Sequence, residues 1–307
     1  MKDARKSFYM PEGTYLNCSY MAPLLREVEE AGIQAIKGRR EPGKINPDQF
    51  FTETEQVRRL VGDMIKGDPS RIVLIPSVSY GMANVTNNLS LDQSQHILLA
   101  GEQFPSNYYP WKRLSDRDGA SVKMINPDDG TASRGKNWNE NILAAIDTHT
   151  AVVAISNVHW ADGTRFNLKA IRQRTNEVGA KLIIDGTQSI GALPFDVSDI
   201  QPDALVCAGY KWLMGPYSLG FAYYGPCFDD GVPVEENWIN RRNSEDFRGL
   251  INYENDYQPG ALRYEVGEHS NFTLVPMFHA ALKQVAAWTP EYIQEYCRSI
   301  IDAPIRR

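Results

Sequence analysis

The chain has 307 residues, of which 42% are hydrophobic and 23% are charged. This composition is typical of a folded protein of about two domains, and it excludes a disordered chain, a coiled coil and a collagen-like repeat. The formal net charge of −6 at pH 7 argues against nucleic acid or an anionic membrane surface as the main partner.

The first part of the chain is predicted to be helical. Apolar residues recur at helical spacing over 21–37 and over 50–66, and the stretch 42–47 between them is predicted to be a loop. We separate an N-terminal segment, 1–45, from the domain that follows.

Seven short apolar runs come next, and helix-like segments separate several of them. The runs cover 71–77, 96–101, 121–126, 151–158, 181–186, 204–209 and 220–225. Their continuous apolar character suits strands that are buried on both faces of a parallel sheet. The helix-like segments cover 80–89, 107–118, 139–147 and 168–179. This alternation predicts an α/β fold, with a mostly parallel seven-stranded sheet flanked by helices, in a large domain over 46–288.

The last part of the chain has a different pattern. Residues 228–259 are rich in Asp, Asn, Glu and Arg and show no clear period, so we predict an irregular segment there. Two more helices are predicted over 274–288 and 291–301. We assign 289–307 to the start of a truncated small domain, and therefore expect the C-terminal small domain to be largely absent.

The sequence carries no signal for targeting, membrane insertion or metal binding. Charged residues follow Met1, and no apolar run approaches the roughly 18 residues of a membrane span. The four cysteines stand far apart and the five histidines show no ligand spacing, so we expect neither a disulfide framework nor a metal site. We expect a cytoplasmic protein with no membrane partner and no nucleic-acid partner.

Two segments place a carboxylate and an amine at the ends of neighbouring predicted strands. Asp185 lies at the carboxyl end of one strand, where open α/β sheets bind ligands, and Lys211 lies just past the next strand. Pyridoxal phosphate chemistry requires these two groups, because the amine forms a Schiff base with the aldehyde and the carboxylate keeps the pyridine nitrogen protonated. Taken alone, an aspartate at a strand end is more often a turn residue, and a lone lysine is usually solvated. Glycine-rich phosphate and dinucleotide loops are missing from the sequence.

The sequence around these two residues resembles the class V aminotransferase family of fold-type I pyridoxal phosphate enzymes. This family includes cysteine desulfurases, kynureninases and isopenicillin-N epimerase-like proteins. The motif D-G-x-Q-S-x-G begins at Asp185, and the motif D-x7-K-W-x-x-G-P runs from Asp203 to Pro216. Residues 15–19 are similar to the opening strand of the family, 101–107 to its ring-stacking loop and 263–267 to the segment that closes its large domain. The resemblance covers nearly the whole chain and implies pyridoxal 5′-phosphate as the cofactor.

The resemblance implies catalytic roles for Lys211 and Asp185. Lys211 would carry the Schiff base and then move the Cα proton, and Asp185 would pair with the pyridine nitrogen. Gln188 would bind the phenolic oxygen of the ring, and Phe104 would stack on the ring. The alternative for Phe104 is an ordinary position in the core. Partial burial and the charge of the cofactor are expected to lower the pKa of Lys211, whereas Asp185 facing a pyridinium would keep a low pKa.

The resemblance also implies a phosphate site. Val78 and Ser79, at the start of a predicted helix, would hold the phosphate, because amides at a helix N-terminus bind anions. Tyr210 occupies the place of a phosphate-binding tyrosine in kynureninases. Ser270 and Asn271 are expected to reach the site of a partner subunit.

Other residues keep two interpretations. His159 and Trp160 follow a predicted strand end, and they either line the substrate pocket or, for the histidine, make ordinary loop contacts. Cys207 is expected to be buried and inert.

The function implied is that of an enzyme acting on an amino acid, with an aminotransferase of the class V type as the leading hypothesis. A kynureninase-like lyase and an isopenicillin-N epimerase-like enzyme are the alternatives. A non-catalytic protein that binds pyridoxal phosphate but lacks the small domain is an alternative of another class. A homodimer is expected, because in the family the pocket is completed across the subunit interface.

The resemblance leaves the substrate open. A desulfurase is disfavoured, because Cys297 does not match the setting of the nucleophilic cysteine in that group. In the family, the small domain supplies the arginine that binds the substrate carboxylate, and Arg263 or an arginine of the partner subunit are the candidates here.

Overall fold

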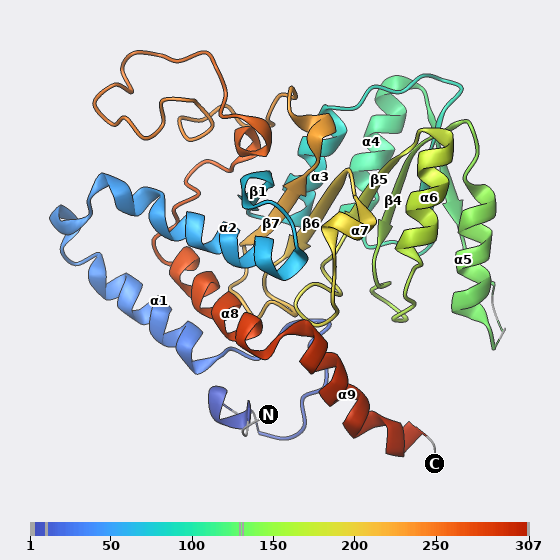
Figure 1. Cartoon of the computed structure of the whole chain (residues 1–307), viewed down its shortest axis with the longest axis horizontal. Coiled ribbons are helices and arrows are strands. Elements are labelled where there is room, and N and C mark those ends of the chain that lie inside the picture. Colours follow the sequence, from blue (N-terminus) through green and yellow to red (C-terminus); the bar gives the residue numbers. More distant parts are fainter. Residues whose placement is uncertain (1–3, 10–11, 129, 131, 306–307) are drawn as a thin grey trace.

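The computed structural model describes residues 4–9, 12–128, 130 and 132–305. Within these residues, one seven-stranded sheet runs through the middle of the molecule, with helices on both of its faces (Figure 1). All seven predicted strands are present, and their ends differ from the prediction by at most two residues. They are β1 (Ile72–Ile75), β2 (His96–Ala100), β3 (Ser121–Ile125), β4 (Thr150–Ser156), β5 (Lys181–Asp185), β6 (Ala204–Ala208) and β7 (Gly220–Tyr224).

The strands lie in the order β1-β7-β6-β5-β4-β2-β3. The strands from β6 through β5, β4 and β2 to β3 pair in parallel, whereas β7 is antiparallel to both β6 and β1. The connection 209–219 holds no crossover helix, so β7 returns beside β6 in the opposite direction. The carboxyl ends of β4, β5 and β6 therefore meet at one edge of the sheet.

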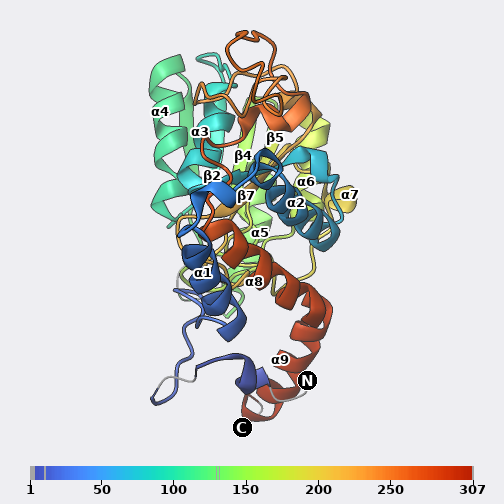
Figure 2. The ribbon, with the colours of Figure 1, turned by 90° about the vertical axis from the view of Figure 1, so that its left-hand side faces the viewer.

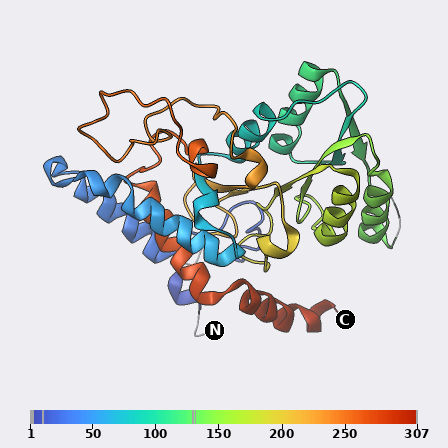
Figure 3. The same cartoon turned by 45° about the horizontal axis from the view of Figure 1, so that its top comes forward.

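Helices lie on both faces of the sheet (Figure 1, Figure 3). Two apolar layers fill the space between these helices and the strands. One layer contains residues of α2 (Thr52–Ile65), α5 (Arg134–Ala145), α6 (Leu168–Val178) and α8 (Leu274–Trp288). The other contains residues of α3 (Val78–Asn87) and α4 (Tyr109–Asp118). Successive strand residues alternate between the layers, as Val73 and Leu74 do. The prediction of strands buried on both faces is confirmed for six strands. It is wrong for β3, which lies at the edge of the sheet and has no fully buried residue.

The N-terminal helix α1 (Arg26–Gly38) packs along α8, with Leu25, Val28 and Ala281 buried between them. A short helix, α7 (Val197–Ile200), precedes β6, and α9 (Pro290–Ile305) follows α8. The first helical turn, η1 (Ala4–Ser7), and α9 lie on the same side of the molecule (Figure 2). The boundaries at 45 and 288 stay predictions.

Some element ends differ from the prediction for identifiable reasons. The helix α5 begins at Arg134, five residues before the predicted start, because its polar first turn hides the apolar period. Residues 15–19, expected as an opening strand, form no strand and end in a turn. The Tyr15 hydroxyl donates to the carbonyl of Met21 at 2.8 Å, which curls this segment, and Leu16 is 88% exposed, so no neighbouring strand covers it.

A buried ion pair ties α2 to β1 and to the segment before α8. The carboxylate of Glu265, 1% exposed, accepts a hydrogen bond from the amide of Leu74 at 2.8 Å and forms an ion pair with Arg58. Burial raises the pKa of Glu265, but the Arg58 charge and hydrogen bonds to the carboxylate outweigh this and lower it overall. The pair therefore stays charged in the core.

We expect Glu265→Gln to lower the free energy of unfolding by about 3 kcal/mol, because it leaves the buried Arg58 charge with only the partly exposed Glu55 as its partner. Urea denaturation measures this change. The matched control is Arg59→Ala on the same helix, which removes an exposed pair with Glu55 and is expected to cost under about 1 kcal/mol. Equal effects of the two substitutions would contradict a structural role for the buried pair.

Candidate active site

A cavity of about 320 Å³ opens at the edge where β4, β5 and β6 end. Asp185 is the last residue of β5, and Lys211 follows the end of β6 by three residues. Of the eight predicted site residues, six line this cavity: Lys211, Asp185, Gln188, Phe104, Val78 and Tyr210. The structure thus brings together residues that lie more than a hundred positions apart in the sequence.

The carboxylate of Asp185 is 7% exposed and accepts a hydrogen bond from the amide of Thr187 at 2.9 Å. Burial raises the pKa of Asp185, while hydrogen bonds from Thr187 and the charge of Lys211 oppose this rise. A buried carboxylate of this kind is stabilised by a cation placed against it.

Lys211 lies at the same end of the sheet, and the residue as a whole is 7% exposed. Burial lowers the pKa of Lys211, as predicted from the sequence, whereas the negative charge of Asp185 raises it. The Nζ atom lies 5.8 Å from the ring centroid of Phe104 and 5.9 Å from that of Tyr210. The lowered pKa favours the uncharged amine, which is the nucleophilic form.

The loop that carries Lys211 is tightly closed. The amide of Gly215 donates to the carbonyl of Gly209 at 2.8 Å, and the amide of Met214 donates to the carbonyl of Lys211 at 3.0 Å. A Cβ atom at Gly215 would fall 2.5 Å from the ring of Phe278, so only glycine allows the loop to rest on α8. This packing fixes the backbone of the loop that carries the lysine.

The N-terminus of α3 faces the cavity through Ser77 and Val78. The Ser77 hydroxyl caps the helix by accepting from the amide of Tyr80 at 3.2 Å, and it lies 2.9 Å from the hydroxyl of Ser79. Free amides and two hydroxyls at the start of a ten-residue helix can bind an anion. Ser79 itself does not line the cavity.

The N-terminal segment contacts two of the residues that line the cavity. The side-chain amide of Gln188 donates to the carbonyl of Ser19 at 3.0 Å and accepts from the indole of Trp212 at 3.2 Å. The amide of Ala22 donates to the carbonyl of Tyr210 at 3.2 Å. These contacts hold Gln188 in place at the rim.

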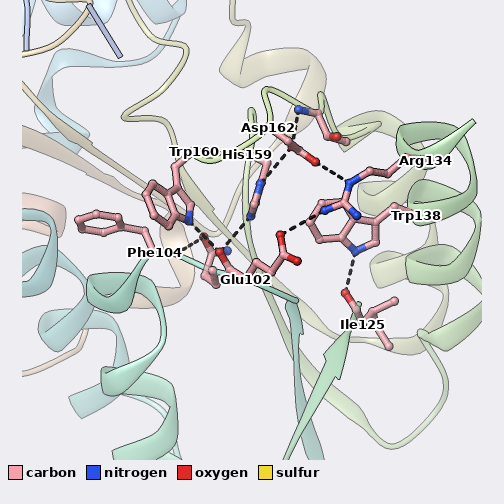
Figure 4. A network of polar contacts seen from close by, with 10 residues as sticks. Glu102, Phe104, Ile125, Arg134, Trp138, His159, Trp160 and Asp162 are labelled. Carbon is pink, nitrogen blue, oxygen red and sulfur yellow. Dashed lines mark hydrogen bonds and ion pairs between the residues drawn. The ribbon is translucent and has the colours of Figure 1, made fainter. Parts of the chain in front are cut away.

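Two aromatic side chains form one side of the cavity (Figure 4). Phe104 and Trp160 meet edge to face with ring centroids 5.5 Å apart. Both keep part of their surface exposed, 39% and 44% respectively. His159 does not line the cavity, so the interpretation as an ordinary loop contact holds for this residue and the pocket interpretation holds for Trp160. Cys207 is buried, and burial raises its pKa well above the usual value, in agreement with an inert thiol.

Two other predicted residues lie away from this cavity. Asn271 caps α8 by accepting from the amides of Thr273 and Leu274 at 3.1 and 2.9 Å. Its contact with a partner subunit stays a prediction. Arg263, a candidate anchor for a substrate carboxylate, donates to the carbonyls of Gly260 and Gly231 and does not reach the cavity.

Sequence reasoning misses several lining residues, namely Ser77, Gln103, Ser156, Thr187 and Tyr217. A signal was available for Ser77, since serine before a helix is a capping residue, and for Ser156 and Thr187, which lie at strand ends. The side-chain nitrogen of Gln103 and the hydroxyl of Ser156 are buried and find no hydrogen-bond partner among the described residues. Buried polar atoms of this kind are normally satisfied, so their presence in the wall indicates a polar ligand.

The described residues contain no group of side chains arranged to hold a metal ion. No helix among them is long and apolar enough to cross a membrane.

Residues 44–229 match the family model for aminotransferase class-V. The chain belongs to the class-V aminotransferase family. The members of this family are enzymes that depend on pyridoxal phosphate.

Curated relatives agree with this class-V assignment. An uncharacterized aminotransferase of Bacillus subtilis, YcbU, is 25% identical over 83% of this chain and 65% of its own length. A probable cysteine desulfurase of Methanothermobacter thermautotrophicus is 29% identical over 55% of this chain and 41% of its own length. Isopenicillin N epimerase of Streptomyces clavuligerus is 25% identical over 62% of this chain and 47% of its own length. The chain thus spans less than two thirds of each of these relatives.

Solved structures establish the fold of this class-V chain. A mutant of C-DES, with glycine covalently linked to its pyridoxal phosphate cofactor, has a TM-score of 0.79 at 20% identity and covers 91% of this chain and 73% of its own. The cysteine desulfurase CsdA of Escherichia coli has a TM-score of 0.78 at 18% identity. The match covers 99% of this chain and 77% of CsdA. The predicted fold type I is therefore confirmed.

We expect Asp185→Asn to lower the pKa of Lys211 further, because it removes the nearby negative charge that favours the protonated amine. The pH dependence of acylation of Lys211 in the protein without added cofactor measures this pKa, with mass spectrometry of the modified peptide as the readout. Lys136, which is exposed on α5, is the internal reference in the same sample. A profile for Lys211 that moves to higher pH in the variant would contradict this coupling.

Proposed function

We propose that this chain is a pyridoxal phosphate-dependent enzyme that acts on an amino acid, with a class V type aminotransferase reaction. The observation that carries the proposal is the pair of buried groups, an amine with a lowered pKa and a carboxylate with a raised pKa, in one cavity at adjacent strand ends. Family membership supports the same conclusion.

The residues present fit this cofactor. The buried carboxylate of Asp185 lacks a full counter-charge, which a protonated ring nitrogen would provide. Gln103 and Ser156 line the same cavity, and each has a buried polar atom without a hydrogen-bond partner among the described residues. The N-terminus of α3 offers the amides that a phosphate requires.

When bound, pyridoxal phosphate supplies an electron sink that stabilises negative charge at the Cα atom of an amino acid. In this proposal, Lys211 would hold the aldehyde group and carry the proton to and from Cα. Asp185 would pair with the ring nitrogen, and Gln188 would bind the phenolic oxygen. Phe104 would pack on the ring and exclude water from it.

The phosphate is assigned to the other end of the cavity. Val78 and Ser79 would bind it through the first turn of α3, together with Ser77, which sequence reasoning missed. Tyr210 would contribute its hydroxyl. Its ring lies 4.6 Å from that of Tyr217, which helps to fix its position.

We further propose a homodimer. Tyr20 and Tyr217 lie beside the mouth of the cavity and are 68% and 63% exposed, and Leu16 in the same N-terminal segment is 88% exposed. Apolar surface of this kind is usually covered by a partner. In such a dimer, Ser270 and Asn271 would approach the site of the partner. The four cysteines are unpaired, which supports a cytoplasmic location.

We expect Lys211→Ala to lose covalent attachment of the cofactor while the protein stays folded. The protein is incubated with pyridoxal phosphate, reduced with borohydride and digested, and the peptides are weighed by mass spectrometry. In the unchanged protein, the peptide that contains Lys211 should carry the added mass. Lys136→Ala, at an exposed position, is the matched control and should retain the label. If the Lys211 peptide is unmodified in a sample that contains pyridoxal phosphate, the proposal is overturned.

The type of reaction has its own test. After incubation with an amino acid, transfer of the amino group leaves an oxo acid and recovers the cofactor in its amine form. Racemisation leaves the cofactor unchanged. Recovery of unchanged cofactor with an inverted amino acid would replace the aminotransferase by the epimerase alternative.

A further inference from the structure

Two loops meet beside the candidate active site, and a set of polar contacts joins them (Figure 4). One loop follows β2 and carries Glu102 and Phe104, and the other follows β4 and carries Trp160 and Asp162. Because β2 and β4 are neighbours in the sheet, both loops leave the same edge side by side.

Glu102 has a left-handed backbone with φ of 50°, a conformation that residues other than glycine rarely adopt. Its carbonyl accepts two hydrogen bonds from the opposite loop, from the indole of Trp160 at 2.7 Å and from Nε2 of His159 at 3.1 Å. The contacts from the second loop therefore hold the first in a conformation that it would not keep alone.

His159 is 1% exposed and lies between two acceptors. Its Nδ1 faces the carboxylate of Asp162 at 3.1 Å, and its Nε2 faces the carbonyl of Glu102. A carbonyl can only accept, so Nε2 is the donor in the contact with Glu102. Trp138 packs against the ring with centroids 4.9 Å apart.

Arg134 of α5 bridges the two loops. Its Nε donates to Asp162 at 2.9 Å, and its terminal nitrogen forms an ion pair with Glu102 at 3.1 Å. Burial raises the pKa of Asp162, but hydrogen bonds from Thr164 and Arg134 lower it to about 2, so the carboxylate stays charged. Only the planar fork of an arginine reaches both carboxylates in this way. We call Arg134, Asp162, His159 and Glu102 the loop clamp.

The loop clamp determines what the cavity wall offers to a ligand. The indole nitrogen of Trp160 is already bonded to Glu102, so the ring presents an apolar surface to the cavity. Val158 and Phe104 line the same side. Among the described residues that line the cavity, the charged ones are Asp185 and Lys211, both assigned to the cofactor. A charged substrate side chain would therefore find no partner at this wall.

We propose that Trp160 determines substrate specificity by forming an apolar wall that favours amino acids with apolar side chains, and that Arg134 is a positioning residue that fixes this wall through the loop clamp. The inference rests on the proposed function, because the wall lies in the cavity assigned to the cofactor and the amino acid.

The experiment compares the cofactor-loaded protein with Trp160→Ala, Arg134→Met and the control Lys136→Met, which removes an exposed cation from the same helix. The visible absorbance of the loaded protein is titrated with L-phenylalanine, L-leucine and L-aspartate. Hydrogen–deuterium exchange of residues 101–106 and 158–164 reports on the loops independently of any amino acid. Thermal unfolding reports on stability.

In the unchanged protein, we expect tighter binding of L-phenylalanine and L-leucine than of L-aspartate. Trp160→Ala should weaken binding of the two apolar amino acids by about fivefold, in keeping with the loss of one aromatic contact, and change that of L-aspartate by less than about twofold. Arg134→Met should reduce the preference for the two apolar amino acids over L-aspartate and speed hydrogen–deuterium exchange in both loops. Lys136→Met should change neither the preference nor the exchange.

Several results would overturn the inference. They are a preference for L-aspartate, an equal effect of Trp160→Ala on all three amino acids, and loss of stability in Arg134→Met without change in preference or loop exchange. A protein that binds no cofactor at all would instead refute the proposed function, and loop exchange in Arg134→Met would still decide the role of the clamp.

Discussion

The burial of two opposite charges at the ends of β5 and β6 is the constraint on which the site depends. In the sheet, Asp185 pairs in register with Val206, and Lys211 follows five positions later, on the loop folded against α8. Burial disfavours the charge on each group, while each charge favours the other. The sheet register and the glycine-containing loop hold them in this costly arrangement. A protein that needed only stability would more readily place apolar residues there.

The sequence predicts the part of this arrangement that depends on local pattern. Continuous apolar runs identify most of the strands because these strands are covered on both faces. A carboxylate at the end of such a run indicates a site only together with the motifs around it. The direction of β7 is not predictable in this way, since an apolar run has the same composition in either orientation. It follows instead from the length of the loop that precedes it.

Other parts of the site have no local signal. Glu102, Arg134 and Asp162 lie on three separate segments, and each has the appearance of a solvated charge in the sequence. Their contacts arise only because β2 and β4 are neighbours while β3 lies outside them, and that order is set by the whole sheet. Residues 15–19 show the opposite error: similarity predicts a strand, but these residues have no strand beside them and pair instead with their own turn. Asn271 illustrates a third limit, because a role across a subunit interface cannot be tested by the contacts of one chain.

The proton chemistry available within one chain also narrows the reaction. Inversion at Cα is most direct with two bases, one on each face of the substrate. Among the described residues that line the cavity, Lys211 is the amine whose pKa is lowered, and Asp185 is committed to the ring nitrogen in the proposed arrangement. Burial raises the pKa of the Tyr210 phenol, which makes it a weaker candidate for accepting a proton at neutral pH. A single lysine that takes the proton from Cα and returns it on the same face suits transfer of an amino group better than inversion. In the proposed function, the buried pair would set the class of chemistry, and the aromatic wall beside it would select the side chain.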